Sequence, residues 1–187
     1  MKNLKTIAIA LLIAVSTLGN AQTKKVDASK SSITWIGKKV TGQHSGTIKL
    51  KEGSLVFRGK TLTGGAFVVD MTSLNSTDLT GEYQEKLNGH LKSEEFFGTE
   101  KYPTSKLIFK TIVNKGNGVY NVTADLTIKG ITAPINFDIT VKGSTTISTL
   151  KIDRTKYGIK YGSGSFFDDL GDKAISDEFE LTVTLKF

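Results

Sequence analysis

The last nine residues, Phe179-Glu180-Leu181-Thr182-Val183-Thr184-Leu185-Lys186-Phe187, alternate strictly between apolar and polar side chains. Because successive side chains of a β-strand point to opposite faces, this alternation is typical of a strand with one face in a core. Shorter segments with the same period of two occur at 33–35, 67–71, 126–128 and 135–141. Gly-containing turn signals lie between the segments, at 51–54, 58–60, 114–118, 129–130 and 142–144. Many short strands at this spacing predict an antiparallel sandwich or barrel.

One segment, residues 76–102, interrupts the alternation. Leu79, Tyr83 and Leu87 recur every fourth residue there, which predicts a helix with Ser76 or Thr77 as its cap. A second short helix is expected to begin at Ser93. A helical insert within an antiparallel sheet often closes one end of a barrel.

The predicted fold class is therefore all-β: an antiparallel barrel of about eight strands, with a short helical insert closing one end. A barrel of this size either fills its interior with side chains or holds one ligand. Alternation alone does not distinguish these two possibilities.

Bulk composition limits the classes of function. The 187 residues suit one domain, and the formal net charge of +7 falls to +5 if the segment carrying Lys2 and Lys5 is removed. No run of Lys and Arg is interleaved with aromatic residues, so the sequence predicts no nucleic-acid partner and at most a weak association with an anionic membrane surface. The absence of cysteine excludes disulfides, thiolate metal sites and a cysteine nucleophile. The oligomeric state is left open, a dimer included.

The N-terminus has the pattern of a secretory signal peptide. Lys2 and Lys5 precede an almost wholly apolar run at 7–18, and small residues then precede a cut after Ala21. The alternative is an uncleaved membrane anchor, but the run is too short to span about 30 Å of hydrocarbon. We expect a signal peptide at 1–21, one domain at 22–187, and a periplasmic or secreted product.

Candidate chemical groups are few. His44 and His90 lack the spacing of a metal pair, so structural hydrogen bonding is favoured over a zinc site. The Gly-rich loop at 162–172 contains Asp168, Asp169 and Asp172, and is interpreted first as a mouth loop and second as a weak cation site. Arg154 ends a strand pattern, where it would either meet a polar head group or brace this loop. No catalytic residue, metal or cofactor is predicted.

Six motifs occur in order along the chain, at 26–27 with 32–35, 42–46, 90–97 with 101–104, 126–134, 152–159 and 175–179. Together they resemble the YceI-like family, the bacterial polyisoprenoid-binding proteins with a lipocalin-like barrel. The chain departs from the commoner pattern at Lys156 and Tyr157, where Asp and Phe are usual, and at Trp35, where Phe is usual.

The resemblance implies a long amphiphilic ligand, such as a polyprenyl chain, a prenylated quinone or a fatty amide, bound for transport, storage or a stress response. Alternation and resemblance together predict the ligand-binding residues Ile33, Trp35, His44, Phe67, Val69, Leu107, Phe109, Leu126, Ile128, Phe137, Ile139, Arg154, Leu181 and Val183. Within this set, His44 and Arg154 are expected near a polar head.

Two alternatives to a lipid-binding protein remain open at this point. One is a hydrolase or isomerase that acts on a small substrate at the barrel mouth, around His44, Arg154 and Asp168. The other is a structural or stress protein whose core is filled.

Overall fold

The computed structural model describes residues 21–187. Within this range there are nine strands, one α-helix and two short 3-10 helices. Their bounds are β1 (Ala21–Lys25), β2 (Asp27–Lys39), β3 (Gly42–Arg58), β4 (Thr61–Ser76), α1 (Gly81–Lys92), β5 (Thr104–Gly116), β6 (Val119–Ile128), β7 (Ile131–Lys142), β8 (Thr145–Asp153), η1 (Arg154–Tyr157), η2 (Gly171–Lys173) and β9 (Ile175–Lys186).

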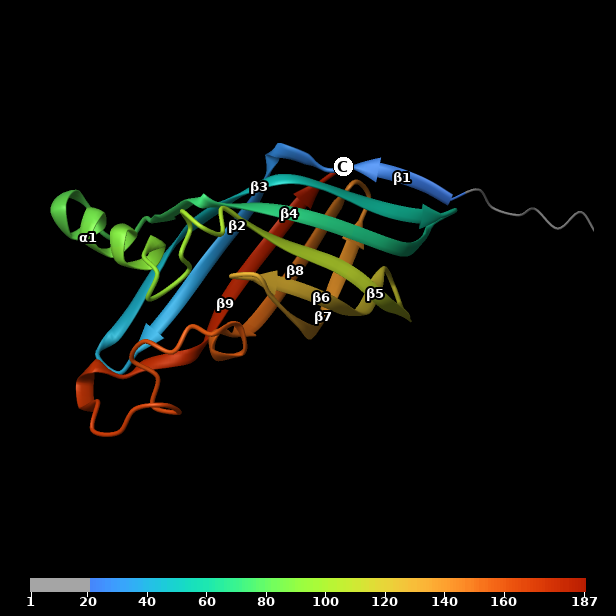
Figure 1. Ribbon diagram of the computed structural model, residues 1–187. Helices are drawn as coiled ribbons and strands as arrows, with labels where there is room; N and C mark the ends of the chain where they lie inside the picture. Colours follow the sequence, from blue (N-terminus) through green and yellow to red (C-terminus); the bar gives the residue numbers. More distant parts are fainter. Residues whose placement is uncertain (1–20) are drawn as a thin grey trace, which may run out of the picture.

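Eight of these strands close into an antiparallel barrel (Figure 1). The order around the ring is β3-β2-β9-β8-β7-β6-β5-β4, and the pairing of β4 with β3 completes it. The ninth strand, β1, pairs with the part of β3 that precedes the turn to β4. Closure removes the exposed sheet edges within the ring. The predicted fold, a barrel of about eight strands with a short helix, is confirmed.

The alternating C-terminal strand, β9, lies between β2 and β8 in the ring. Val183 is opposite Ile33 on β2 and Ser148 on β8, so the apolar face of β9 points to the interior together with theirs. The outward face carries the polar residues of the motif, and Glu180 bonds Lys38 across the strands at 2.8 Å.

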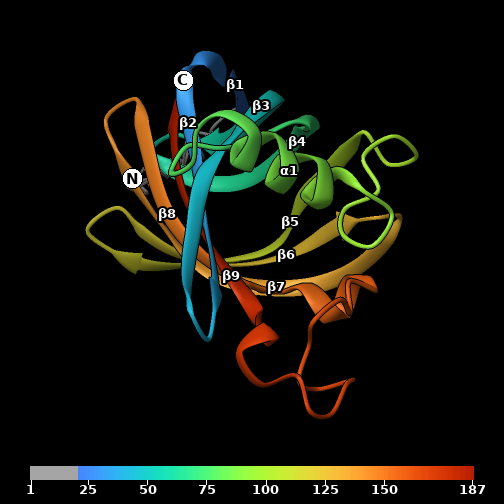
Figure 2. The ribbon, with the colours of Figure 1, turned by 90° about the vertical axis from the view of Figure 1, so that its left-hand side faces the viewer.

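The interior is filled at one end and hollow at the other. Leu55, Leu62 and Val122 are almost fully buried, and they pack near the end where β3 turns into β4. Phe57 stacks on Phe187 in the same region, with ring centroids 5.4 Å apart. The rest of the interior is hollow, and the wall of this cavity includes both Thr146, near the start of β8, and Leu91 of α1. Figure 2 views the barrel from the side on which α1 lies. The sequence left open whether the interior is filled with side chains or hollow, and this barrel has a part of each kind.

The helical insert differs from its prediction in three respects. Ser76 ends β4, so α1 begins only at Gly81, with Thr80 as an N-cap that makes no side-chain cap bond. Tyr83 is exposed and does not face the barrel. The second helix expected at Ser93 is absent from the described residues 93–97, which form a turn. Ser93 is extended and ends α1, and the following turn buries Phe96.

The expected signal peptide, residues 1–21, lies almost wholly outside the described residues 21–187, and so does most of its cleavage site. Among residues 21–187, no helix is both long and apolar enough to cross a membrane.

Candidate functional site

The hollow end of the barrel is a cavity of about 240 Å³. All strands of the ring contribute inward side chains to its wall, and so does α1. The residues that the sequence analysis singled out lie together on this wall: Ile33, Trp35, His44, Phe67, Val69, Leu107, Phe109, Leu126, Ile128, Phe137, Ile139, Arg154, Leu181 and Val183. Their role in binding stays a prediction, because no ligand is present.

The cavity is long relative to its volume. On β8 its wall runs from Thr146 to Ile152, which is about 20 Å at the usual rise of a strand. An apolar wall of this length can accommodate an extended chain.

Sequence reasoning missed part of the wall. Leu87, Leu91 and Phe96 come from the insert, where strand alternation gives no signal. Thr146 and Ser148 occupy inward positions of β8 but are polar, so hydrophobic alternation passed over them. The pattern of Leu150 and Ile152 on the same strand, extended two residues at a time toward the N-terminus, would have found both.

Trp35 is placed in the wall by a close approach of β2, β3 and β4. Its indole N–H donates to the Thr47 carbonyl at 3.3 Å. Gly46 lies beneath the ring, and a Cβ there would come within 2.6 Å of the indole and would overlap the carbonyl oxygen of Asn75. The glycine at this position therefore leaves the space that the indole occupies.

His44 lies at the mouth of the cavity and is held by a carboxylate. Its Nδ1 is 2.8 Å from Asp78 Oδ2, and Asp78 also accepts bonds from the Ser45 N–H and the Ser76 hydroxyl. Burial raises the pKa of Asp78, but the bonds from His44, Ser76 and Ser45 outweigh it and lower the pKa below its usual 3.8. The pair orients His44 at the mouth.

A second polar and aromatic group lines the mouth around His90 of α1. The His90 ring packs edge-on against Phe96 and Tyr161, with centroids 5.0 and 4.6 Å away. Its Nε2 lies 3.3 Å from a carboxylate oxygen of Glu95. Both histidines thus lie beside carboxylates in the cavity wall, His44 on β3 next to the turn from β2 and His90 on α1.

Arg154 is buried, with 3% of its surface exposed. Its guanidinium donates to the carbonyls of Ile159, Tyr161, Ile175 and Ser176 at 2.9–3.0 Å. One Nη lies 3.5 Å from Asp177. These partners precede and follow the loop at 162–172, so the geometry favours the bracing role over contact with a head group.

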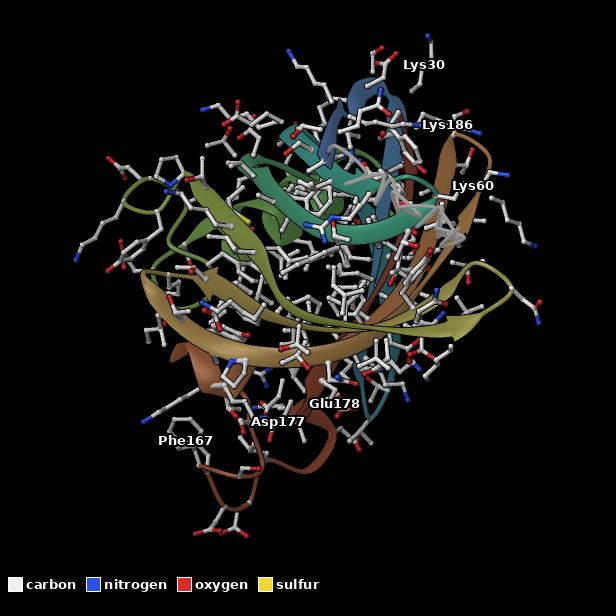
Figure 3. All side chains as sticks on the ribbon, turned by 90° about the vertical axis from the view of Figure 1, so that its right-hand side faces the viewer. Lys30, Lys60, Phe167, Asp177, Glu178 and Lys186 are labelled. Carbon is white, nitrogen blue, oxygen red and sulfur yellow. The ribbon has the colours of Figure 1, made fainter. Side chains whose placement is uncertain are left out.

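The loop itself does not line the cavity. Phe166 and Phe167 are half exposed, and Figure 3 shows Phe167 on the segment that projects from the barrel. Asp168 is exposed and is not part of the cavity wall, so the three residues considered for an enzyme do not come together. Among residues 21–187 no three His, Asp or Glu side chains are grouped to hold a metal ion.

Comparison with known proteins agrees with this architecture. A family model of the YceI-like domain matches residues 25–187. The chain belongs to the YceI-like family. It is 31% identical over 144 residues to the UPF0312 protein plu2095 of Photorhabdus laumondii, covering 75% of this chain and 71% of that protein. The match to a UPF0312 protein of Shewanella denitrificans, also 31% identical, covers 42% of that relative's length.

Two solved structures share the fold. BcnA of Burkholderia cenocepacia superposes with a TM-score of 0.68 at 22% identity, covering 86% of this chain and 98% of its own. A polyisoprenoid-binding domain from Saccharophagus degradans, described as implicated in plant cell wall breakdown, superposes with a TM-score of 0.58 at 16% identity, covering 86% and 95%. Family and fold together identify a YceI-like barrel.

Proposed function

We propose that this YceI-like protein binds a long amphiphilic lipid of the isoprenoid type, with the chain in the cavity and the polar head at the mouth. A polyprenyl chain, a prenylated quinone and a fatty amide all have this form. The observation that carries the proposal is the apolar cavity whose wall runs about 20 Å along β8. The polyisoprenoid-binding neighbour supports it by sharing the barrel.

The energetics of such a channel favour binding without catalysis. Each methylene group removed from water contributes roughly 0.8 kcal/mol, so affinity grows with the length of chain that the channel accepts. Two further methylenes contribute about 1.6 kcal/mol, which is more than tenfold in Kd. The protein would then serve as carrier, store or stress-related binder of the lipid.

The polar head is assigned to the mouth. Lys39, His44, His90, Ser176 and Glu178 all lie on its rim. Arg154 is left out of this assignment because four of its five N–H donors already bond backbone carbonyls. A rim with both signs of charge suits an uncharged or zwitterionic head better than a multiply charged one.

The proposed location is the periplasm or the exterior, after cleavage behind Ala21. The order of the positive start, apolar run and small residues in 1–21 supports export. N-terminal sequencing of the product made in a bacterial host tests it. A product that begins at Gln22 is expected, whereas a membrane-bound product that begins at Met1 would refute it.

The binding proposal is tested by narrowing the channel. Val69 lies on the cavity wall, and Val69→Trp should prevent retention of geranylgeraniol while the barrel still folds. Val113 on β5 is 55% exposed and lies outside the wall, so Val113→Trp is the matched control. Retained lipid is measured by mass spectrometry after gel filtration. Equal retention by both variants, or none by the parent, would contradict the proposal.

A further inference from the structure

Phenylalanine rings lie where the hollow part of the barrel meets its filled part. Phe67 on β4 and Phe109 on β5 belong to the cavity wall. Leu62 is the next buried residue of β4 toward the turn from β3, and it is 1% exposed but not part of the wall. Leu55 on β3 and Val122 on β6 are likewise buried outside the wall. Phe67 and Phe109 are therefore the wall residues of β4 and β5 that lie farthest from the mouth.

Two glycines allow these rings to lie flat over the neighbouring strands. Phe67 is opposite Gly53 on β3, and a Cβ at Gly53 would come within 2.5 Å of its ring. A Cβ at Gly65 on β4 would likewise come within 2.6 Å of the ring of Phe109. Neither glycine has a positive φ, so the backbone itself would accept a side chain at both positions. What these positions exclude is a Cβ beneath the ring.

The rings support one another inside the barrel. The ring centroids of Phe67 and Phe109 are 5.5 Å apart, and those of Phe109 and Phe137 on β7 are 6.0 Å apart. Ala124 on β6, between β5 and β7, is opposite Phe109 and fully buried, and its small side chain leaves room for the two rings to meet. Aromatic pairs at these separations attract each other beyond the burial of their area. Phe67, Phe109 and Phe137 thus form one connected surface, which we call the aromatic shelf.

We propose that the aromatic shelf stops a chain that enters the barrel, and so sets the chain length that this protein prefers. This inference rests on the proposed function and deepens it by naming the length class of the ligand. β8 lies opposite β4 in the ring, and the cavity wall on β8 runs about 20 Å. An extended chain advances about 1.25 Å per carbon, so about 16 main-chain carbons, or about four isoprene units, fit along this wall. A longer chain would leave its remainder outside the mouth.

The test uses lysophosphatidylcholines with saturated chains of about 10 to 20 carbons, each below the concentration at which it forms micelles. These probes share one zwitterionic head, which stays at the mouth because burying charge is costly, so only chain length differs. Binding is followed by the fluorescence of Trp35, the single tryptophan of the chain and part of the cavity wall. In the parent protein each added methylene should lower Kd about fourfold up to about 16 carbons, with no further gain beyond that limit.

Two substitutions should move this limit in opposite directions. Phe109→Leu shortens the side chain and deepens the cavity, so the limit should move to longer chains by about two carbons. Gly65→Ala places a Cβ beneath the ring of Phe109, which must then lift into the cavity, so the limit should move to shorter chains. A general loss of stability would not produce both shifts. Either variant alone decides the matter once its melting curve shows that it folds.

Phe97→Leu is the matched control for Phe109→Leu. Phe97 follows α1 in the chain and lines the same cavity, but it is not part of the aromatic shelf. The same change at Phe97 should weaken the binding of all chain lengths by a similar factor and leave the limit in place.

The outcomes separate the two proposals. If affinity keeps rising through the longest probe, or if the limit stays in place in the folded variants Phe109→Leu and Gly65→Ala, the shelf is not a stop while the lipid-binding function stands. The stop is also refuted if Phe97→Leu moves the limit as Phe109→Leu does. If neither the lysophosphatidylcholines nor geranylgeraniol bind, the proposed function itself fails, and this inference fails with it.

Discussion

Replacing Arg154 tests whether a single side chain holds the loop at 162–172 in place. Its guanidinium bonds carbonyls of residues that precede the loop, Ile159 and Tyr161, and of residues that follow it, Ile175 and Ser176. Arg154→Met keeps an apolar stem of similar length and removes all of these bonds. Arg154→Lys keeps the charge but not the planar fork that reaches several carbonyls at once.

The expected magnitude follows from the groups left without partners. A buried acceptor that loses its donor costs about 1–3 kcal/mol. One of the four bonds is buried and three are part-buried, so we take the low end for each, about 4 kcal/mol in total. Asp177 also loses the cation 3.5 Å from it. We expect Arg154→Met to lower the free energy of unfolding by about 4 kcal/mol, and Arg154→Lys to fall between it and the parent.

Two measurements check this expectation. Urea denaturation gives the change in midpoint, and limited trypsin digestion reports the loop, because Lys160 and Lys173 flank it and are exposed. Cleavage after both should accelerate in Arg154→Met. Arg58 is exposed, and Arg58→Met serves as the control. An Arg154→Met protein with the midpoint and digestion rate of the parent would refute the bracing role.

Three further substitutions probe the barrel. Val183→Asp places a charge without a partner on the inner face of β9 and should cost about 3 kcal/mol or more in urea denaturation; an unchanged midpoint would mean that the face is reversed. Tyr157 is 1% exposed, its hydroxyl has no partner within 21–187, and burial, with Asp153 next, raises its pKa to about 12. The contribution of this hydroxyl to stability is thus complete below its usual pKa of 10.0 and is lost as pH rises toward 12. Tyr157→Phe should abolish this alkaline loss of stability without lowering stability at neutral pH. A variant whose stability falls at alkaline pH as the parent's does would contradict this. Gly46→Ala should shift the fluorescence of Trp35 and lower the melting temperature, because a Cβ has no room under the indole; parental spectra and melting would show that the strands adjust freely.

Much of the barrel could be predicted because burial imposes a period of two on each strand. The faces of β9, β7 and β2 follow directly from the spacing of residues such as Phe137, Ile139 and Ile33. The start of the helix could not be predicted, because Ser76 continues β4 by pairing with Gly46, a residue thirty positions earlier. Local capping signals carry no information about such a partner.

The site was predictable only where it is apolar. Thr146 and Ser148 face the cavity as their neighbours do, but their polarity hides them from a hydrophobic pattern. The role of Arg154 is hidden for another reason. Its partners are backbone carbonyls, and any residue type supplies a carbonyl, so no side-chain motif marks them. Arg154 thus lies in the cavity wall as predicted, but its guanidinium bonds backbone carbonyls of the loop ends.

The central claim, that the hollow end of the barrel holds a long apolar chain, is tested most directly by native mass spectrometry. The purified protein is incubated with a mixed lipid extract that contains prenyl lipids, separated from free lipid, and weighed intact and after organic extraction. We expect one lipid per chain, with a long isoprenoid or comparable amphiphilic chain recovered in the extract. A protein that emerges with no bound lipid, and with the mass of its bare chain, would contradict the claim.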